Sequence, residues 1–231
     1  MAADPAAPRG IPKPPAVAAR PRDRRGFPVP AITPWADGEP RFAANGAARV
    51  AICASERRCS VCGLVMAPGP VWRVVSGREA AAIADAQAAG RAYLNNAPTG
   101  EAPGHRGCML FAAMACPYLA RPGARRGAAA QAVGLSAQRG DARGDGGAVA
   151  GFGRYQYTYG PYSAPLFRFA GLVELLGHDL GAEHLDALRA EIAAGPADPD
   201  TCPGYLLGDE AAAERRASVL WHHRHRSVTQ S

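Results

Sequence analysis

The sequence has almost no lysine. Of its 26 basic residues only Lys13 is a lysine, and the others are arginines in a chain that is also rich in alanine, a pairing that codon bias in a GC-rich genome produces. The arginine preference is therefore no evidence for phosphate recognition. Aromatic residues are scarce as well, at 7%, so the 48% hydrophobic fraction rests largely on small side chains that bury little area each. These shortages predict a compact centre with loose ends.

Long apolar runs are missing too. No run of eighteen or more apolar residues occurs, and residues 1–15 are rich in proline where a signal peptide needs an apolar stretch. We therefore expect a cytoplasmic protein with no membrane partner. In a reducing cytoplasm, the six cysteines are better explained as metal ligands or free thiols than as disulfides.

The net charge of +6 is unevenly distributed. Residues 1–26, 121–126 and 214–226 carry +4, +3 and +3, which leaves about −4 for the rest of the chain. The body is thus mildly acidic, whereas duplex-binding domains present a basic surface. Nucleic acid remains a possible partner through the basic tails, where binding would act by counterion release.

Four residues have the spacing of a zinc site. Cys59-x-x-Cys62 and His105-x-x-Cys108 form two pairs, and 42 residues separate them. Zinc takes four nitrogen or sulfur ligands in a tetrahedron, and a pair two residues apart can hold one edge of it. Gly63, directly after the second cysteine, suits a knuckle in which the chain turns sharply. We predict one structural zinc ion held by Cys59, Cys62, His105 and Cys108.

Two other cysteines are possible substitutes in that site. Cys116 returns to the helical face of His105, but eleven residues of helix would place it about 16 Å along the axis. Cys53 is able to reach the ion only if the approach to the knuckle folds back. With the four named ligands the coordination is closed, which favours a structural metal over a catalytic one.

The segments around these ligands predict a treble-clef-like order. Two short apolar runs, 64–66 and 71–75, flank a Pro/Gly turn and indicate a β-hairpin. Residues 78–94 are alanine-rich and predict a helix. A second helix over 105–115 is expected to stop at Cys116-Pro117, since proline denies the next turn its amide. Knuckle, hairpin and ligand-bearing helix together predict the zinc module.

Other elements are predicted by local patterns. An edge strand and hairpin are expected over 27–42, a short helix or strand over 47–53, a helix around Leu185, Leu188 and Ile192, and a further helix over 209–220. Tyr155, Tyr157 and Tyr159 alternate with polar residues as in a strand, which turns back into 166–169. This tyrosine face either stacks bases, with Arg154 and Arg168 nearby, or packs on the helix of Leu185.

Composition divides the chain into five parts. A disordered tail is predicted over 1–21, the zinc-binding module over 22–120, a basic Ala/Gly linker over 121–151, a strand-hairpin-helix segment over 152–195, and a helix with a His/Arg tail over 196–231. The predicted fold class is α+β: a small treble-clef-like zinc module with β-hairpins and short helices, plus a C-terminal strand-helix segment.

Several motifs together resemble a group of actinobacterial and actinobacteriophage proteins of unassigned function. The resemblance covers residues 22–126 well and 152–195 loosely. It rests on the run Arg22 to Pro30, Trp35 with Asp37-Gly38, Cys59 to Gly63, His105-Arg106-x-Cys108, Cys116-Pro117-Tyr118-Leu119 and Arg121-Pro122. It implies a zinc-cysteine protein and, because that group has no assigned activity, no substrate.

Three function classes follow from the sequence. The favoured hypothesis is an interaction or adaptor module with a protein partner and a structural zinc ion. The alternatives are a nucleic-acid-associated protein that uses its basic tails, and an enzyme with a catalytic cysteine or an open metal site. His178 and His184, outside the zinc motif, are expected to be solvated or capping residues rather than catalytic ones.

Overall fold

The computed structural model describes residues 10–95, 99–120, 123–125, 130–132, 135–137, 147–159, 165–177, 182–194 and 201–228. Its α-helices are α1 (Pro15–Ala18), α2 (Ala47–Ser55), α3 (Gly77–Ala88), α4 (Arg106–Ala115), α5 (Pro117–Ala120), α6 (Ala182–Ala194) and α7 (Glu210–Val228), with a 3₁₀ turn η1 (Gly204–Leu206). Its strands are β1 (Trp35–Ala36), β2 (Glu39–Pro40), β3 (Val71–Ser76), β4 (Ala130–Ala132), β5 (Leu135–Ala137), β6 (Gly147–Tyr159) and β7 (Pro165–Gly177). The predicted α+β class is confirmed.

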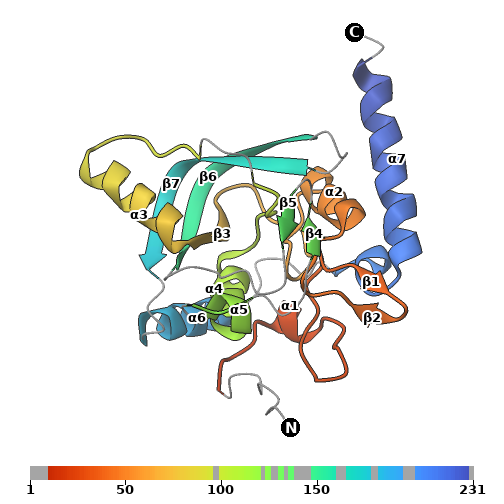
Figure 1. The fold of residues 1–231 in the computed structure, drawn as a ribbon, viewed down its shortest axis with the longest axis horizontal. Helices are drawn as coiled ribbons and strands as arrows, with labels where there is room; N and C mark the ends of the chain where they lie inside the picture. Colours follow the sequence, from red (N-terminus) through yellow and green to blue (C-terminus); the bar gives the residue numbers. More distant parts are fainter. Residues whose placement is uncertain are drawn as a thin grey trace.

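The centre of the molecule is an antiparallel sheet in the order β3-β6-β7 (Figure 1). β3 alternates buried and partly exposed residues, as a strand with one covered face does. The first six residues of β6 are all buried, so both faces of this strand are covered there. Small side chains suit that position, and a Cβ at Gly151 would lie 2.5 Å from the indole nitrogen of Trp72.

The long hairpin of β6 and β7 follows the predicted alternation. Tyr155 and Tyr157 pack on Phe167 and Phe169 from β7, with ring centroids 6.0–6.1 Å apart. Arg154 and its neighbours at alternate positions are exposed. The rings of Tyr155 and Tyr157 thus pack against the main hydrophobic cluster, which disfavours the base-stacking hypothesis for this face. The predicted packing on the helix of Leu185 is wrong, since that helix, α6, packs on α4.

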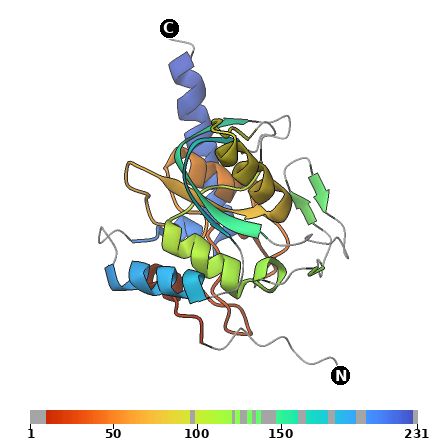
Figure 2. The same cartoon turned by 90° about the vertical axis from the view of Figure 1, so that its left-hand side faces the viewer.

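Helices α4 and α6 lie side by side below the sheet (Figure 2). Both agree with their predicted positions, and α4 ends at Cys116, just before Pro117. A Cβ at Gly107 would come within 3.2 Å of the Glu191 Cβ, so the missing side chain allows the two helices to approach closely. His184, predicted to be solvated or capping, is instead buried at 3% exposure.

The predicted disordered tail is wrong for residues 10–21, while residues 1–9 lie outside the described residues. Residues 15–18 form α1, and Val17 is buried in the main hydrophobic cluster. Arg20 is only 3% exposed because its guanidinium donates to backbone carbonyls of other segments, including Val29 and Leu206. The proline-rich composition of this segment therefore could not predict its long-range contacts.

The predicted hairpin of residues 64–66 and 71–75 is also wrong. Val65 forms an isolated bridge with Arg58, and β3 pairs with β6. Residues 147–151, predicted as the end of the linker, belong to the buried half of β6. One hydrophobic cluster consequently contains Val61 of the zinc module together with Phe167 and Leu188 from beyond the linker.

The N-terminal hairpin is shorter than predicted. Only β1 and β2 pair, and Asp37 and Gly38 turn the chain with left-handed φ values of 54° and 74°. The following segment, predicted as helix or strand, is the helix α2.

The C-terminal segment packs on α2 through a second hydrophobic cluster that includes Ile52, Leu206 and Ala213. Arg49, at 0% exposure, forms an ion pair of 2.7 Å with Glu210 at the start of α7. The far end of α7 projects from the body (Figure 1). Within the described residues, no helix has the length and apolar character to cross a membrane.

Candidate metal centre

The first cysteine pair lies in a tight turn between α2 and β3. The amide of Cys59 donates to the carbonyl of Leu64 at 2.8 Å, and the amide of Gly63 donates to the carbonyl of Cys59 at 2.9 Å. Gly63 has φ +80°, a conformation that glycine adopts without strain. This turn directs Cys59 and Cys62 inward, and both side chains are fully buried.

The second pair is placed by the start of α4. His105 is the N-cap residue, not a first-turn residue as predicted, and its side chain makes no capping hydrogen bond. Gly104 exchanges two backbone hydrogen bonds with Trp72 of β3, at 2.8 and 2.9 Å. The amide of Ser60 in the knuckle donates to the Pro103 carbonyl at 3.0 Å. These contacts fix the position of His105 against both the sheet and the knuckle.

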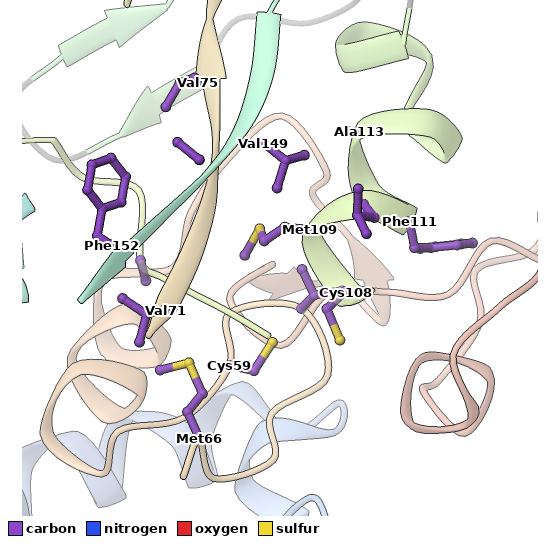
Figure 3. Packing of buried hydrophobic residues seen from close by; sticks show 14 of the residues in the cluster. Cys59, Met66, Val71, Val75, Cys108, Met109, Phe111, Ala113, Val149 and Phe152 are labelled. Atoms are coloured by element: carbon purple, nitrogen blue, oxygen red, sulfur yellow. The ribbon is translucent and has the colours of Figure 1, made fainter. Parts of the chain in front are cut away.

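The four predicted ligands meet at one point. The ligand atoms of Cys59, Cys62, His105 and Cys108 all lie within 4.8 Å of one another. The Cys62 Sγ and His105 Nδ1 atoms are 3.4 Å apart, close to the edge of about 3.5 Å that a tetrahedral zinc site requires. Figure 3 shows Cys59 and Cys108 at the edge of the hydrophobic cluster, with Met66 and Met109 beside them. These four residues could therefore hold a metal ion.

The imidazole of His105 is oriented for a ligand at Nδ1. Its Nε2 atom lies 3.2 Å from the carbonyl oxygen of Val65, which can only accept a hydrogen bond. A proton on Nε2 leaves the lone pair of Nδ1 facing the sulfur cluster. The exposed Val65, which sequence reasoning assigned to a hairpin, thus orients a ligand through its backbone.

Hydrogen bonds and burial control the protonation of the cluster. Burial opposes ionisation of Cys59, but hydrogen bonds from the Cys108 and Cys62 thiols and from His105 outweigh it and hold the pKa of Cys59 well below its ordinary value. Hydrogen bonds with Cys59 and Cys62, together with burial, raise the pKa of Cys108 well above its ordinary value. One thiolate is thus already favoured, whereas a bound cation must displace the protons of Cys62 and Cys108, whose pKa values are both raised.

Charged residues attach the start of α4 to its neighbours. Arg106 forms a two-pronged ion pair with Glu174 of β7, at 2.7 Å for each contact, and a weaker one of 3.2 Å with Glu191 of α6. All three side chains are partly exposed, so these pairs add only modest stability. Their main effect is to hold the N-terminus of α4 against β7 and α6. The partial positive charge of a helix N-terminus also favours a thiolate at Cys108.

The possible substitutes are not in the cluster. Among the described residues, the group with metal-ligand geometry contains neither Cys53, which is buried in α2, nor Cys116, which follows the end of α4. Sequence reasoning missed the role of Gly104. A Cβ at that residue would lie 2.8 Å from the Cys59 Sγ and 2.4 Å from the Met109 Cε. A glycine directly before the His-x-x-Cys pair was the available signal.

Replacing Gly63 with alanine is expected to destabilise the protein by about 2–3 kcal/mol. The new Cβ combines an unfavourable left-handed φ with a position 2.6 Å from the Cys202 Sγ. Gly38→Ala is the matched control, because Gly38 has φ +74° with nothing within 4 Å of the added Cβ, and strain alone costs about 1 kcal/mol. Chemical denaturation of both variants measures the difference. Equal losses of stability in the two variants would show that the contact with Cys202 adds nothing to the destabilisation.

The fold and the cluster define the class of molecule: an α+β protein with a buried Cys₃His group suited to a metal ion. Comparisons with protein-family models, with curated proteins and with solved structures gave no match. The resemblance to actinobacterial zinc-cysteine proteins therefore stays a prediction from the sequence.

Proposed function

We propose that this chain binds one structural zinc ion through Cys59, Cys62, His105 and Cys108 and works as an interaction module for a protein partner. The convergence of four nitrogen and sulfur ligands in a buried cluster carries the proposal. Soft thiolates with one imidazole in a tetrahedral arrangement favour zinc over metals that prefer oxygen ligands. The ion would join the knuckle to the start of α4, two segments that the contact of the His105 ring with the Val65 carbonyl also connects.

Closed coordination supports binding rather than catalysis. Three thiolates and an imidazole fill the four positions of zinc and leave none for water or substrate. Cys59, Cys62 and Cys108 are at most 3% exposed, so a substrate has no direct approach to their sulfurs. An enzyme using an open metal site is correspondingly disfavoured. Val219 of α7, at 45% exposure, offers a partner an exposed apolar side chain to pack on.

Cobalt substitution tests the closed site. Cobalt(II) in a tetrahedral thiolate site gives intense visible absorption, and this spectrum responds to any new ligand. We expect the spectrum of the cobalt-loaded protein to be unchanged by added azide or imidazole. A spectrum that shifts on adding either ligand would reveal an open position and would favour the enzyme alternative.

The nucleic-acid alternative has one structural observation in its favour. Arg154 and Arg168 are exposed on β6 and β7, and no ion pair involving either is found within the described part of the chain. Two arginines provide only a small positively charged surface for binding nucleic acid. Single-stranded RNA binding that falls with rising salt, and falls further in an Arg154→Ala/Arg168→Ala double variant, would support this alternative. Binding insensitive to salt would exclude it.

Metal affinity is expected to increase with pH across the neutral range. The raised pKa of Cys108, caused by hydrogen bonds with the other thiols and by burial, means that the metal-free cluster keeps a proton that metal binding must release. The bound state therefore holds fewer protons, and each proton released raises the apparent affinity up to about tenfold per pH unit. Competition with a chromophoric chelator at pH 6, 7 and 8 measures this slope. A flat profile would contradict thiolate coordination.

A further inference from the structure

The guanidinium group of Arg20 lies against the knuckle that carries the first cysteine pair. Arg20 is only 3% exposed, and its Nη1 atom is 3.5 Å from the position that a Cβ on Gly63 would occupy. Gly63 directly follows the ligand Cys62. The amide of Ala31 donates to the carbonyl of Val61 at 2.9 Å, so the chain that follows Arg20 also lies along the knuckle. A buried positive charge is therefore placed beside the predicted metal site.

Three hydrogen bonds hold this guanidinium group in place. Its Nε donates to the Val29 carbonyl at 2.9 Å, its Nη2 to the Leu206 carbonyl at 2.7 Å, and its Nη1 to the Cys202 Sγ at 2.9 Å. The Cys202 sulfur itself donates to the carbonyl of Pro203 at 3.8 Å, as a neutral thiol does. These three acceptors fix the direction of the guanidinium group without offsetting its charge.

Carboxylates do not offset that charge either. In the part of the chain that the structure describes, no carboxylate forms an ion pair with Arg20. The neighbouring Arg49, which is also buried and donates to the Leu206 carbonyl at 3.2 Å, pairs with Glu210 at 2.7 Å. A buried cation without a counter-charge is costly. Arg20 thus requires negative charge from a group other than a carboxylate.

The metal-loaded cluster carries a negative charge of the right size. Its three thiolates outweigh a divalent ion by one negative charge, and a neutral imidazole adds none. Burial lowers the pKa of Arg20, and negative charge on the sulfurs of Cys202 and Cys62 acts against this shift. Of these two sulfurs, that of Cys62 is the one that a bound metal ion keeps as a thiolate.

We propose that Arg20 is the counter-charge of the metal site, and that its guanidinium group offsets the negative charge of the loaded cluster and positions the knuckle around Cys62. The inference rests on the proposed zinc site. Arg20 is a positioning residue and not a ligand, because it acts through its charge and through the knuckle backbone. It also connects the metal centre to residues 10–21 and, through Leu206, to the C-terminal segment.

Metal affinity gives the first test. In competition with a chromophoric chelator at pH 7, we expect Arg20→Gln to bind zinc about tenfold more weakly than wild type, since loss of a group behind a ligand typically has this effect. Arg49→Gln is the matched control, because Arg49 is equally buried and shares the Leu206 carbonyl but is paired with Glu210. An equal loss of affinity in both variants would mean that Arg20 acts only through stability, and would overturn the proposal.

The cobalt spectrum separates charge from packing. A cation near a thiolate lowers the energy of the sulfur lone pairs, so its removal moves the sulfur-to-cobalt charge-transfer band to longer wavelength. We expect this shift in cobalt-saturated Arg20→Gln, with the d–d bands of the tetrahedral site unchanged. Arg20→Lys keeps the positive charge and is expected to retain the wild-type band position. A band that stays in place in Arg20→Gln, or that moves equally in Arg20→Lys, would overturn the proposal.

Two outcomes need separate interpretation. If Arg20→Gln does not fold, Arg20→Lys decides the matter: zinc affinity within about threefold of wild type supports the proposal, and a loss of about tenfold overturns it. Wild-type protein that takes up neither zinc nor cobalt would contradict the proposed function and this inference together. A wild-type protein that binds metal, with an Arg20→Gln variant that binds it equally well, would overturn the inference alone.

Discussion

Replacing Cys59 with serine is expected to abolish metal binding and to prevent cooperative folding of the protein. The Cys59 sulfur is fully buried, belongs to the four-residue cluster, and accepts a hydrogen bond from the His105 amide at 3.4 Å. Binding of structural zinc is worth about 10–16 kcal/mol in zinc-finger peptides, which exceeds the stability of most single domains. Elemental analysis and thermal melts of the purified variant measure both effects.

Cys116→Ser is the matched control for that variant. Cys116 follows the end of α4, outside the cluster, and is half-buried. We expect this variant to keep one equivalent of metal and a melting temperature within a few degrees of wild type. Metal that survives the loss of Cys59, or that requires Cys116, would show that the ligand set is wrong.

Replacing Arg49 with alanine is expected to destabilise the protein by at least about 3 kcal/mol, or roughly 10 °C in melting temperature. Arg49 is the largest of the fully buried side chains. Its loss leaves Glu210 without its ion pair, removes donors to Ala31 and Leu206, and opens a cavity between α2 and α7. Thermal and urea denaturation of the metal-loaded variant measure the effect.

Arg41→Ala is the control for Arg49. Arg41 forms an ion pair with Asp37, but both side chains are more than half exposed, and such pairs contribute up to about 1 kcal/mol. A loss at Arg49 no larger than the loss at Arg41 would mean that α7 does not depend on this buried contact.

The four ligands could be predicted from the sequence because the motifs that identify them are only a few residues long. Each pair of ligands is separated by two residues, and Gly63 marks the turn that the first pair needs. Helix α4 and the β6–β7 hairpin were predictable for the same reason, since proline stops and alternating residues act over a few positions. The two pairs were also predicted to lie close together in space, because one zinc ion requires four ligands.

The pairing of β3 with β6 could not be predicted in the same way. Residues 71–76 have a closer apolar neighbour in 64–66, which made a hairpin the natural interpretation. The actual partner, 147–152, begins more than seventy residues later and, apart from Phe152, consists of small residues that carry little hydrophobic signal. Small residues suit a strand that is buried on both faces. That burial depends on helices elsewhere in the chain, so local periodicity could not predict it.

The buried arginines were the other failure of sequence reasoning. Arg20 lies in a proline-rich segment that looked disordered, and Arg49 lies in a short alanine-rich run. Arginine is almost never fully buried unless it is paired. Their partners, Cys202 and Glu210, are more than 150 positions away, so the neighbouring sequence could not predict these contacts.

X-ray absorption at the zinc edge of the purified protein measures the metal and its ligands. We expect one zinc ion per chain with three sulfur ligands at about 2.3 Å and one nitrogen at about 2.0 Å. A protein without zinc, or a zinc ion surrounded mainly by oxygen and nitrogen, would contradict the proposed site.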